Sequence, residues 1–114
     1  NGDTAADLLK VGWCRKNADD LKPVGGKPPN KWGFYDMHGN VWEWVQDAFH
    51  SDYRRGPKDR NPWLQDEPGN EGKRVLRGGA YNSEPDECRS ATRSADLSQA
   101  KLNVYGCRLV FSFR

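Results

Sequence analysis

The stretch at residues 29–44, PNKWGFYDMHGNVWEW, constrains the fold of this chain more than any other part of the sequence. It holds three of the five tryptophans. Gly39 and Asn40 near its centre indicate a turn, because both residues tolerate a positive φ at low cost. The flanks, residues 32–35 and 41–44, are aromatic and β-branched, which is typical of buried strands. We therefore expect a tight loop between two aromatic strands.

Two carboxylates enclose this turn, with Asp36 before it and Glu43 after it. A turn can direct successive backbone carbonyls inward, and calcium binds several carboxylate and carbonyl oxygens at once. The spacing is therefore compatible with a calcium site. In the alternative interpretation, Asp36 caps backbone amides in the turn and Glu43 pairs with an arginine. The residues alone leave both interpretations open.

The composition of the 114 residues is that of one loop-rich domain at most. Only 35% of the residues are hydrophobic, and 30% are charged. Twelve glycines and seven prolines favour many turns and few long helices. Five Trp, four Tyr and four Phe side chains supply much of the area that such a chain can bury. We therefore expect a fold held together by aromatic clusters.

Charge and hydropathy argue against two classes of partner. The net charge is only +2, and residues 52–60 mix both signs, so we expect no nucleic-acid-binding stripe. No apolar run approaches the ~18–20 residues of a membrane span, and no signal peptide is visible. The first residue is Asn1 rather than Met, which is typical of a processed or trimmed chain. An exported or cell-surface location is the favoured expectation.

Three further stretches predict regular elements. Residues 4–18 predict the one helix of the chain, with a threonine as its N-cap. Residues 74–80 predict a short strand that ends in paired glycines. Residues 104–111 predict the closing strand, in which alternation places Leu109 and Phe111 on one face.

The segment between the predicted strands at 41–44 and 74–80, residues 46–73, is polar and rich in Gly-Pro, Asn-Pro and Pro-Gly pairs. It predicts one long surface excursion whose ends lie close together. Tyr53 and Trp63 within it either pack back onto the core or form a ligand-facing rim.

Four arginines lie within motif blocks, and we expect their side chains to hold loops in place by donating to carbonyls and carboxylates. One guanidinium can satisfy several acceptors at once. These residues are Arg77, Arg89, Arg93 and Arg108.

Four blocks carry a resemblance to a known family: PNKWGFYDMHGNVWEWVQD, RVLRGGAYN, CRSATR and YGCRLVF. In order and spacing they resemble the formylglycine-generating enzyme (sulfatase-modifying factor) family, from Trp13 to Val110. The resemblance implies an irregular, loop-rich α+β fold related to C-type lectins, with short strands and one or two short helices. The blocks belong to the C-terminal half of the longer family members. It therefore implies that residues 1–114 are the C-terminal portion of such a domain, completed by a second chain or a missing N-terminal half.

The resemblance also implies a ligand set for calcium. Carried over by position, the ligands are the side chains of Asp36 and Glu43 and the backbone carbonyls of Gly39 and Val41. The family and the residues thus favour the same site, and we expect Ca²⁺ there.

Enzymes of this family convert a sulfatase cysteine to formylglycine, with two cysteines that bind copper and activate oxygen. A thiolate pair suits Cu(I), because soft sulfur selects it. Between Gly79 and Arg93 this chain has one cysteine, Cys88, and Ser90 stands where the resemblance places the second. We therefore expect neither copper nor this oxidase activity. In the alternative, a missing N-terminal half supplies the active residues.

The three cysteines of the chain are an odd number, so at least one thiol is free or pairs outside the chain. Cys88 is expected to pair with Cys14 or Cys107, or to be a buried free thiol. Cys107 stands where the family commonly has Phe, which predicts a buried side chain.

A binding function remains. The resemblance extends to variable proteins of diversity-generating retroelements, whose variable ligand-contacting stretch maps here to residues 80–105. This stretch is rich in residues suited to adaptable contacts. We therefore expect a non-oxidising, calcium-stabilised ligand-binding or scaffold domain for a protein or peptide ligand. The predicted ligand contacts are Tyr81, Asn82, Ser83, Ser94, Asp96, Asn103 and Tyr105.

Overall fold

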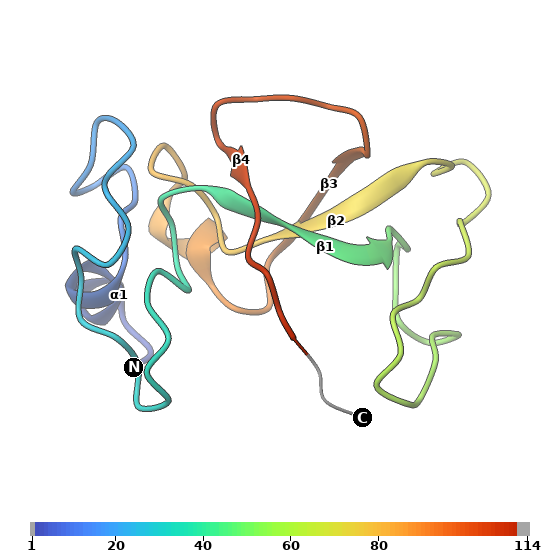
Figure 1. Ribbon diagram of the computed structural model, residues 1–114, viewed down its shortest axis with the longest axis horizontal. Helices are drawn as coiled ribbons and strands as arrows, with labels where there is room; N and C mark the ends of the chain where they lie inside the picture. The colour runs from blue at the N-terminus through green and yellow to red at the C-terminus, as the bar shows by residue number, and fades with distance from the viewer. Residues whose placement is uncertain (1, 112–114) are drawn as a thin grey trace.

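The computed structural model describes residues 2–111. One short α-helix, one 3₁₀ turn and four strands are connected by long loops (Figure 1). This architecture confirms the expected loop-rich α+β class. Within the described residues, no helix has the length and apolar character that crossing a membrane requires. In chain order the elements are α1 (Ala5–Val11), β1 (Trp42–Ala48), β2 (Lys73–Arg77), η1 (Pro85–Cys88), β3 (Arg93–Leu97) and β4 (Tyr105–Gly106).

The four strands form one curled sheet in the order β3-β2-β1-β4. β2 pairs antiparallel with both β1 and β3, whereas β4 pairs parallel with β1. The hydroxyl of Tyr105 on one edge strand donates to Asp96 on the other edge strand at 2.9 Å. The residues between them cross above the central strands in Figure 1. This hydrogen bond therefore ties the two edges of the sheet together.

The core lies on the central strand β2. Val75 and Leu76 are almost completely buried, and their buried neighbours in the core are small side chains such as Ala48 and Ala80. Tyr105 packs edge-to-face on Trp44, with ring centroids 5.3 Å apart. Aromatic residues thus supply contact area that the small core residues do not.

The helix begins as expected and ends earlier than expected. Thr4 caps it, with its hydroxyl accepting from the amide of Asp7 at 3.1 Å. The predicted helix 4–18 is wrong after Val11. Gly12 is the C-cap, and the Asn17 side chain donates to the carbonyls of Leu9 and Gly12. The side-chain amide of asparagine can end a helix in this way, because it competes with the backbone amides for the last helical carbonyls.

The two aromatic flanks of the central loop behave differently. The prediction for residues 41–44 is confirmed in that β1 begins at Trp42. The predicted strand at 32–35 is wrong, and Trp32 is 71% exposed. The side chain of Asn30 accepts from the amides of Trp32 and Phe34 at 3.0 and 3.1 Å. This asparagine turn replaces a strand ladder, and it outweighs the aromatic composition.

The long excursion is confirmed, although β1 runs on to Ala48 before it starts. Its ends lie together, because the amide of Phe49 donates to the carbonyl of Lys73 at 3.1 Å. Trp63 folds back and stacks on His50, with ring centroids 3.3 Å apart. Tyr53 is 55% exposed.

The closing strand is shorter than expected. Only Tyr105–Gly106 pair with β1, and Leu109 and Phe111 are 82% and 84% exposed. The alternation of residue types failed as a signal because no element covers either face of this segment among the described residues. Cys107 is exposed rather than buried, and it is a free thiol, as are Cys14 and Cys88.

Candidate functional site

The central loop is clamped from three sides. Gly39 and Asn40 have φ values of 76° and 67°, which confirms the predicted turn. The amide of Gly39 donates to the carbonyl of Gly78 at 2.7 Å, and the amide of Asn40 donates to the carbonyl of Trp13 at 2.8 Å. The buried Asn40 side chain accepts from the Lys22 amide and donates to its carbonyl. Segments near residues 13, 22 and 78 thus fix the loop.

Asp36 carries the most unusual atom of the loop. Its Oδ2 accepts from the amide of Gly25 at 2.7 Å, whereas its Oδ1 is buried without a hydrogen-bond partner. A buried carboxylate oxygen without a partner is costly, because it has lost water and gained nothing. Asp36 is also held at φ 53°, in the left-handed region. The loop therefore presents a strained, incompletely satisfied acceptor.

Glu43 is paired with Arg108. The guanidinium donates from Nη2 to Oε1 at 2.8 Å and from Nε to Oε2 at 3.0 Å. The same Nη2 donates to the carbonyl of Asp36 at 3.1 Å. The Glu43 carboxylate raises the pKa of Arg108 above its ordinary value. The arginine on Glu43 in the alternative interpretation is therefore present, whereas the amide on Asp36 comes from Gly25 and not from the turn.

All four predicted calcium ligands line one pocket of ≈ 330 Å³, together with Arg108. Among residues 2–111, no backbone hydrogen bond ends on the carbonyls of Gly39 or Val41. In the same residues, no group of three or more His, Cys, Asp or Glu side chains is arranged to hold a metal ion. A cation here needs the two carboxylates and the backbone carbonyls together. Such an all-oxygen donor set fits calcium rather than a transition metal.

The predicted ligand contacts fall into two groups, one in β3, β4 and the connection between them and the other in the turn at residues 81–83. Asp96 and Tyr105 meet through the hydrogen bond between the edge strands, and burial raises the pKa of Tyr105. Ser94 lies in β3 opposite Leu76. Ser83 is buried, and its hydroxyl accepts from the amide of Ala80, so it is engaged internally. Tyr81 and Asn82 share the turn of Ser83, and Asn103 is exposed in the connection to β4.

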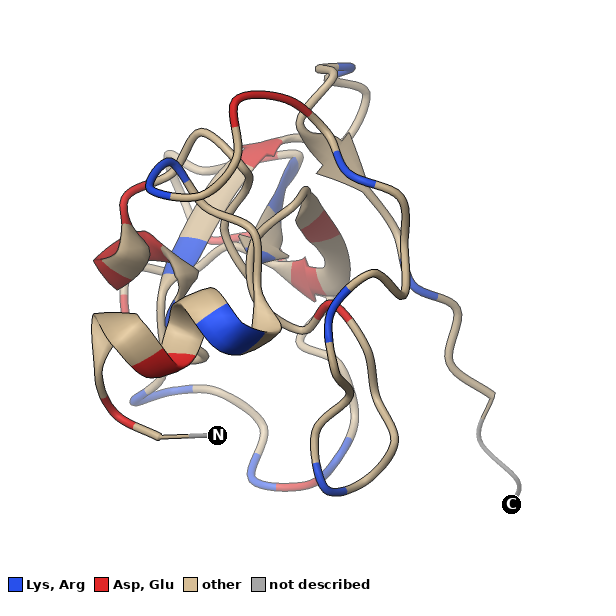
Figure 2. Ribbon diagram, turned by 90° about the vertical axis from the view of Figure 1, so that its left-hand side faces the viewer, with Lys and Arg blue, Asp and Glu red and all other residues tan. Residues whose placement is uncertain are grey.

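The other three motif arginines, like Arg108, donate to acceptors as expected. Arg77 donates to the carbonyl of Ser90 at 2.9 Å, and Arg93 donates to that of His50 at 2.7 Å. Arg89 donates to a carbonyl within its own turn at 3.1 Å. Basic and acidic residues are interspersed along the chain (Figure 2).

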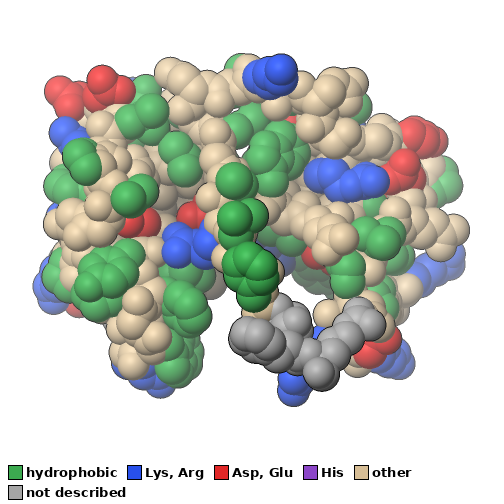
Figure 3. Space-filling model, in the orientation of Figure 1, with side chains coloured by type: hydrophobic (Ala, Val, Ile, Leu, Met, Phe, Trp, Pro, Cys, Tyr) green, Lys and Arg blue, Asp and Glu red, His purple; other side chains and the backbone are tan. Residues whose placement is uncertain are grey.

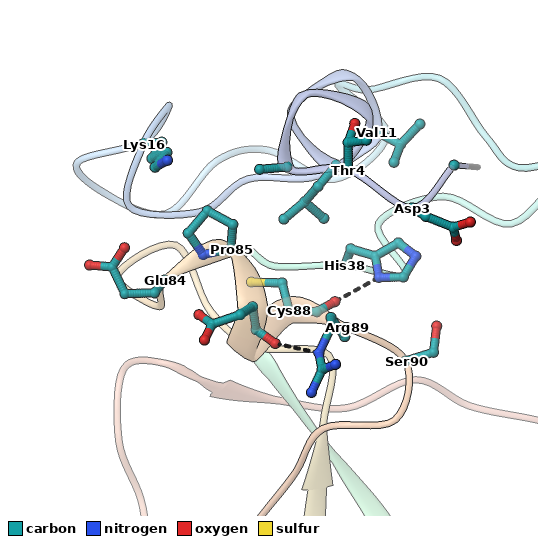
Figure 4. A pocket seen from close by; sticks show the side chains of 14 residues that line it. Asp3, Thr4, Val11, Lys16, His38, Glu84, Pro85, Cys88, Arg89 and Ser90 are labelled. Carbon is teal, nitrogen blue, oxygen red and sulfur yellow. Dashed lines mark hydrogen bonds between the residues drawn. The ribbon is translucent and has the colours of Figure 1, made fainter.

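A second cavity, which sequence analysis missed, lies between α1 and η1 (Figure 4). Its volume is ≈ 590 Å³. Leu8, Val11 and Pro85 line it, and the His38 ring lies at its side with Nδ1 2.8 Å from the carbonyl of Cys88. Its lining comes from three distant parts of the sequence. One of these parts, around Pro85, lies inside the predicted variable stretch, residues 80–105.

The thiol of Cys88 is completely buried beside this cavity. Burial raises its pKa to about 12, and nearby Cys14 and Glu87 add to the effect. The thiol therefore stays protonated at neutral pH, whereas copper ligation and nucleophilic attack require the thiolate.

Comparison with known proteins yields a consistent set of relatives. Residues 2–113 match the sulfatase-modifying factor enzyme 1-like domain. The chain is 38% identical over 89 residues to the serine/threonine-protein kinase pkn1 of Chlamydia pneumoniae. This alignment covers 78% of this chain and 14% of the kinase. It is 35% identical over 89 residues to the formylglycine-generating enzyme of Streptomyces coelicolor, which covers 75% of this chain and 27% of the enzyme.

Solved structures agree. PvdO from Pseudomonas aeruginosa superposes with a TM-score of 0.78 at 29% identity, over 94% of this chain and 40% of that one. Treponema denticola variable protein 1 superposes with a TM-score of 0.75 at 30% identity, over 94% of this chain and 38% of that one. This chain thus spans two fifths or less of the length of these relatives.

Proposed function

Because this chain belongs to the sulfatase-modifying factor enzyme 1-like family, we propose that it acts as a calcium-stabilised, non-oxidising ligand-binding or scaffold domain. The observation that carries the calcium part is the buried, unpartnered Oδ1 of Asp36. It lies in one pocket with Glu43, Gly39 and Val41. Bound calcium would supply positive charge to both carboxylates and link the two ends of the loop.

The calcium proposal is tested by thermal unfolding in excess Ca²⁺ and in chelator. Calcium at 100 times its Kd stabilises by about 2.7 kcal/mol, which raises the melting temperature of a domain of this size by about 10 °C. Asp36→Ala should abolish this rise. Asp59→Ala is the matched control, because Asp59 also accepts a backbone amide, that of Asn61, in an exposed loop. An unchanged melting temperature of the wild-type chain in Ca²⁺ would refute the proposal.

The ligand-binding part is supported by two findings. The variable protein of Treponema denticola shares the fold at 30% identity. The cavity between α1 and η1, with an apolar lining and a few polar groups, has the size of small-ligand and side-chain pockets. A peptide or protein ligand is thus offered two surfaces. One is this cavity, and the other is the set of predicted contacts on β3 and β4.

Peptides selected from a display library against the whole chain test which surface binds. Leu8→Arg would fill the cavity with a charged side chain, and Asn103→Lys would alter the exposed connection to β4. Loss of binding only in Leu8→Arg assigns the cavity, and loss only in Asn103→Lys assigns the predicted contacts. If no peptide is enriched, or if neither variant affects the enriched peptides, the ligand-binding proposal fails.

The oxidase alternative has less support. It needs a second cysteine near Cys88, and Ser90 stands at the position that the family resemblance indicates. The high pKa of the buried Cys88 thiol also opposes copper ligation. Oxygen consumption with copper and a sulfatase peptide, in the presence of a complementary N-terminal half, would restore this alternative.

We also propose that a second polypeptide segment of the family fold covers the exposed apolar side chains of this chain. Trp32, Phe34 and Phe111 are 71%, 54% and 84% exposed. In Figure 3, hydrophobic side chains gather on the lower left of the visible face and along the C-terminal segment. Exposed aromatic groups of this kind mark interfaces. Intact mass and size-exclusion chromatography of the native sample should reveal a second chain or a larger parent chain, and a stable isolated monomer would contradict this proposal.

A further inference from the structure

We infer that Arg108 is a built-in cation that occupies the Glu43 carboxylate and sets the calcium affinity of the loop, an inference that rests on the proposed calcium site. Arg108 is far from the loop in sequence and close to it in space. Its guanidinium contacts both carboxylate oxygens of Glu43 and the carbonyl of Asp36. Of the four predicted calcium ligands, Arg108 thus occupies one, the Glu43 carboxylate.

The chemistry of the pocket sets up a competition. A bidentate arginine satisfies a carboxylate as a hard cation does, with charge and fixed geometry. A divalent ion in the same pocket would meet the guanidinium as a like charge, which is unfavourable at close range. The Oδ1 of Asp36 receives nothing from Arg108, because the arginine reaches only the backbone oxygen of that residue. Arg108 therefore satisfies the Glu43 carboxylate and leaves the Asp36 carboxylate for calcium.

The competition also involves the C-terminal segment. Among the described residues, the hydrogen bonds of segment 107–111 are those that the Arg108 side chain makes to Glu43 and Asp36. Leu109, Val110 and Phe111 are more than 80% exposed. When calcium takes the Glu43 carboxylate, Arg108 loses both hydrogen bonds to Glu43, and the segment keeps only the hydrogen bond to the Asp36 carbonyl. Occupancy of the loop is thereby coupled to the freedom of an apolar segment.

Calorimetric titration of Ca²⁺ into the wild-type chain, Arg108→Gln and Arg108→Lys tests this inference. Removal of the competing charge should tighten calcium binding by about 10-fold or more in Arg108→Gln. Arg108→Lys should lie between the two, since lysine keeps the charge without the fork. Arg89→Gln is the control, because the Arg89 side chain donates to a carbonyl of its own turn and does not line the pocket of the loop. The calcium affinity of this variant should equal that of the wild-type chain.

Two results separate the inference from the proposal beneath it. If the wild-type chain binds calcium and Arg108→Gln binds it equally or more weakly, only the role of Arg108 is overturned. If neither chain binds calcium, both fail. Should Arg108→Gln not fold, the Nε–H resonance of Arg108 in the wild-type chain gives a second readout. It should lose its hydrogen-bonded shift at saturating Ca²⁺, and an unchanged resonance would overturn the inference.

Discussion

Gly39→Ala provides the most direct test of how the central loop is held. Gly39 has φ 76°, and an alanine in the left-handed region costs roughly 1–2 kcal/mol. The added methyl would also lie 2.7 Å from the carbonyl carbon of Trp13 and 3.1 Å from its nitrogen, whereas carbon atoms pack at about 3.5–4.0 Å. The loop must then move away and weaken its hydrogen bonds to Trp13 and Gly78, each worth about 0.5–1.5 kcal/mol. The expected total loss is about 2–5 kcal/mol.

Gly69→Ala is the matched control, because Gly69 has φ 86° and nothing within 4 Å of an added methyl. This variant should lose only the free energy that an alanine costs in the left-handed region. Both variants are unfolded in urea with chelator present, so that calcium does not contribute, and tryptophan fluorescence gives the free energy of unfolding. Equal losses of unfolding free energy in the two variants would refute the claim that the Trp13 backbone leaves no room for a side chain at Gly39.

Three further outcomes follow from the core, the thiols and the edge strands. Leu76→Ala should cost about 2–5 kcal/mol in urea unfolding, because Leu76 is 0% exposed. A thiol reagent should modify Cys107 at once and Cys14 and Cys88 only on unfolding, since the first is exposed and the others are buried. Burial raises the pKa of Tyr105, so the folded state favours the protonated phenol. The contribution of the Tyr105 phenol to the free energy of unfolding is full below the unfolded pKa of about 10. It is lost as the pH rises through the higher folded pKa. The urea midpoint of Tyr105→Phe should therefore not show this decrease at alkaline pH.

The elements that sequence analysis predicted correctly are those fixed by local chemistry. The positive φ values of Gly39 and Asn40, the N-cap of α1 and the strand at β2 each depend on a few neighbouring residues. The errors arose where a distant or competing contact decides. Asn30 turns the aromatic flank away from a strand, and Asn17 closes the helix that periodicity would continue.

The candidate site follows the same rule. Its four predicted ligand residues line one pocket. The spacing indicated the two carboxylates of Asp36 and Glu43, and the family resemblance added the carbonyls of Gly39 and Val41. Two features were not predictable from that spacing. Oδ2 of Asp36 is used by the amide of Gly25, which leaves Oδ1 alone. The sequence suggested an arginine on Glu43 without showing that it would be Arg108.

The register of β4 connects this loop to the predicted ligand contacts. Trp42 pairs with Tyr105, and Glu43 pairs with Gly106, so the residue after the loop contacts the strand that closes the sheet. Tyr105 in turn reaches Asp96 on the opposite edge. A cation that tightens the loop would therefore act on the predicted ligand contacts through the sheet, although it touches none of them. The Tyr105 hydrogen bond and the pairing of β4 with β1 fix the C-terminal end of the connection between β3 and β4, and the amide of Ser98 holds its start by donating to the carbonyl of Gly72 at 3.0 Å.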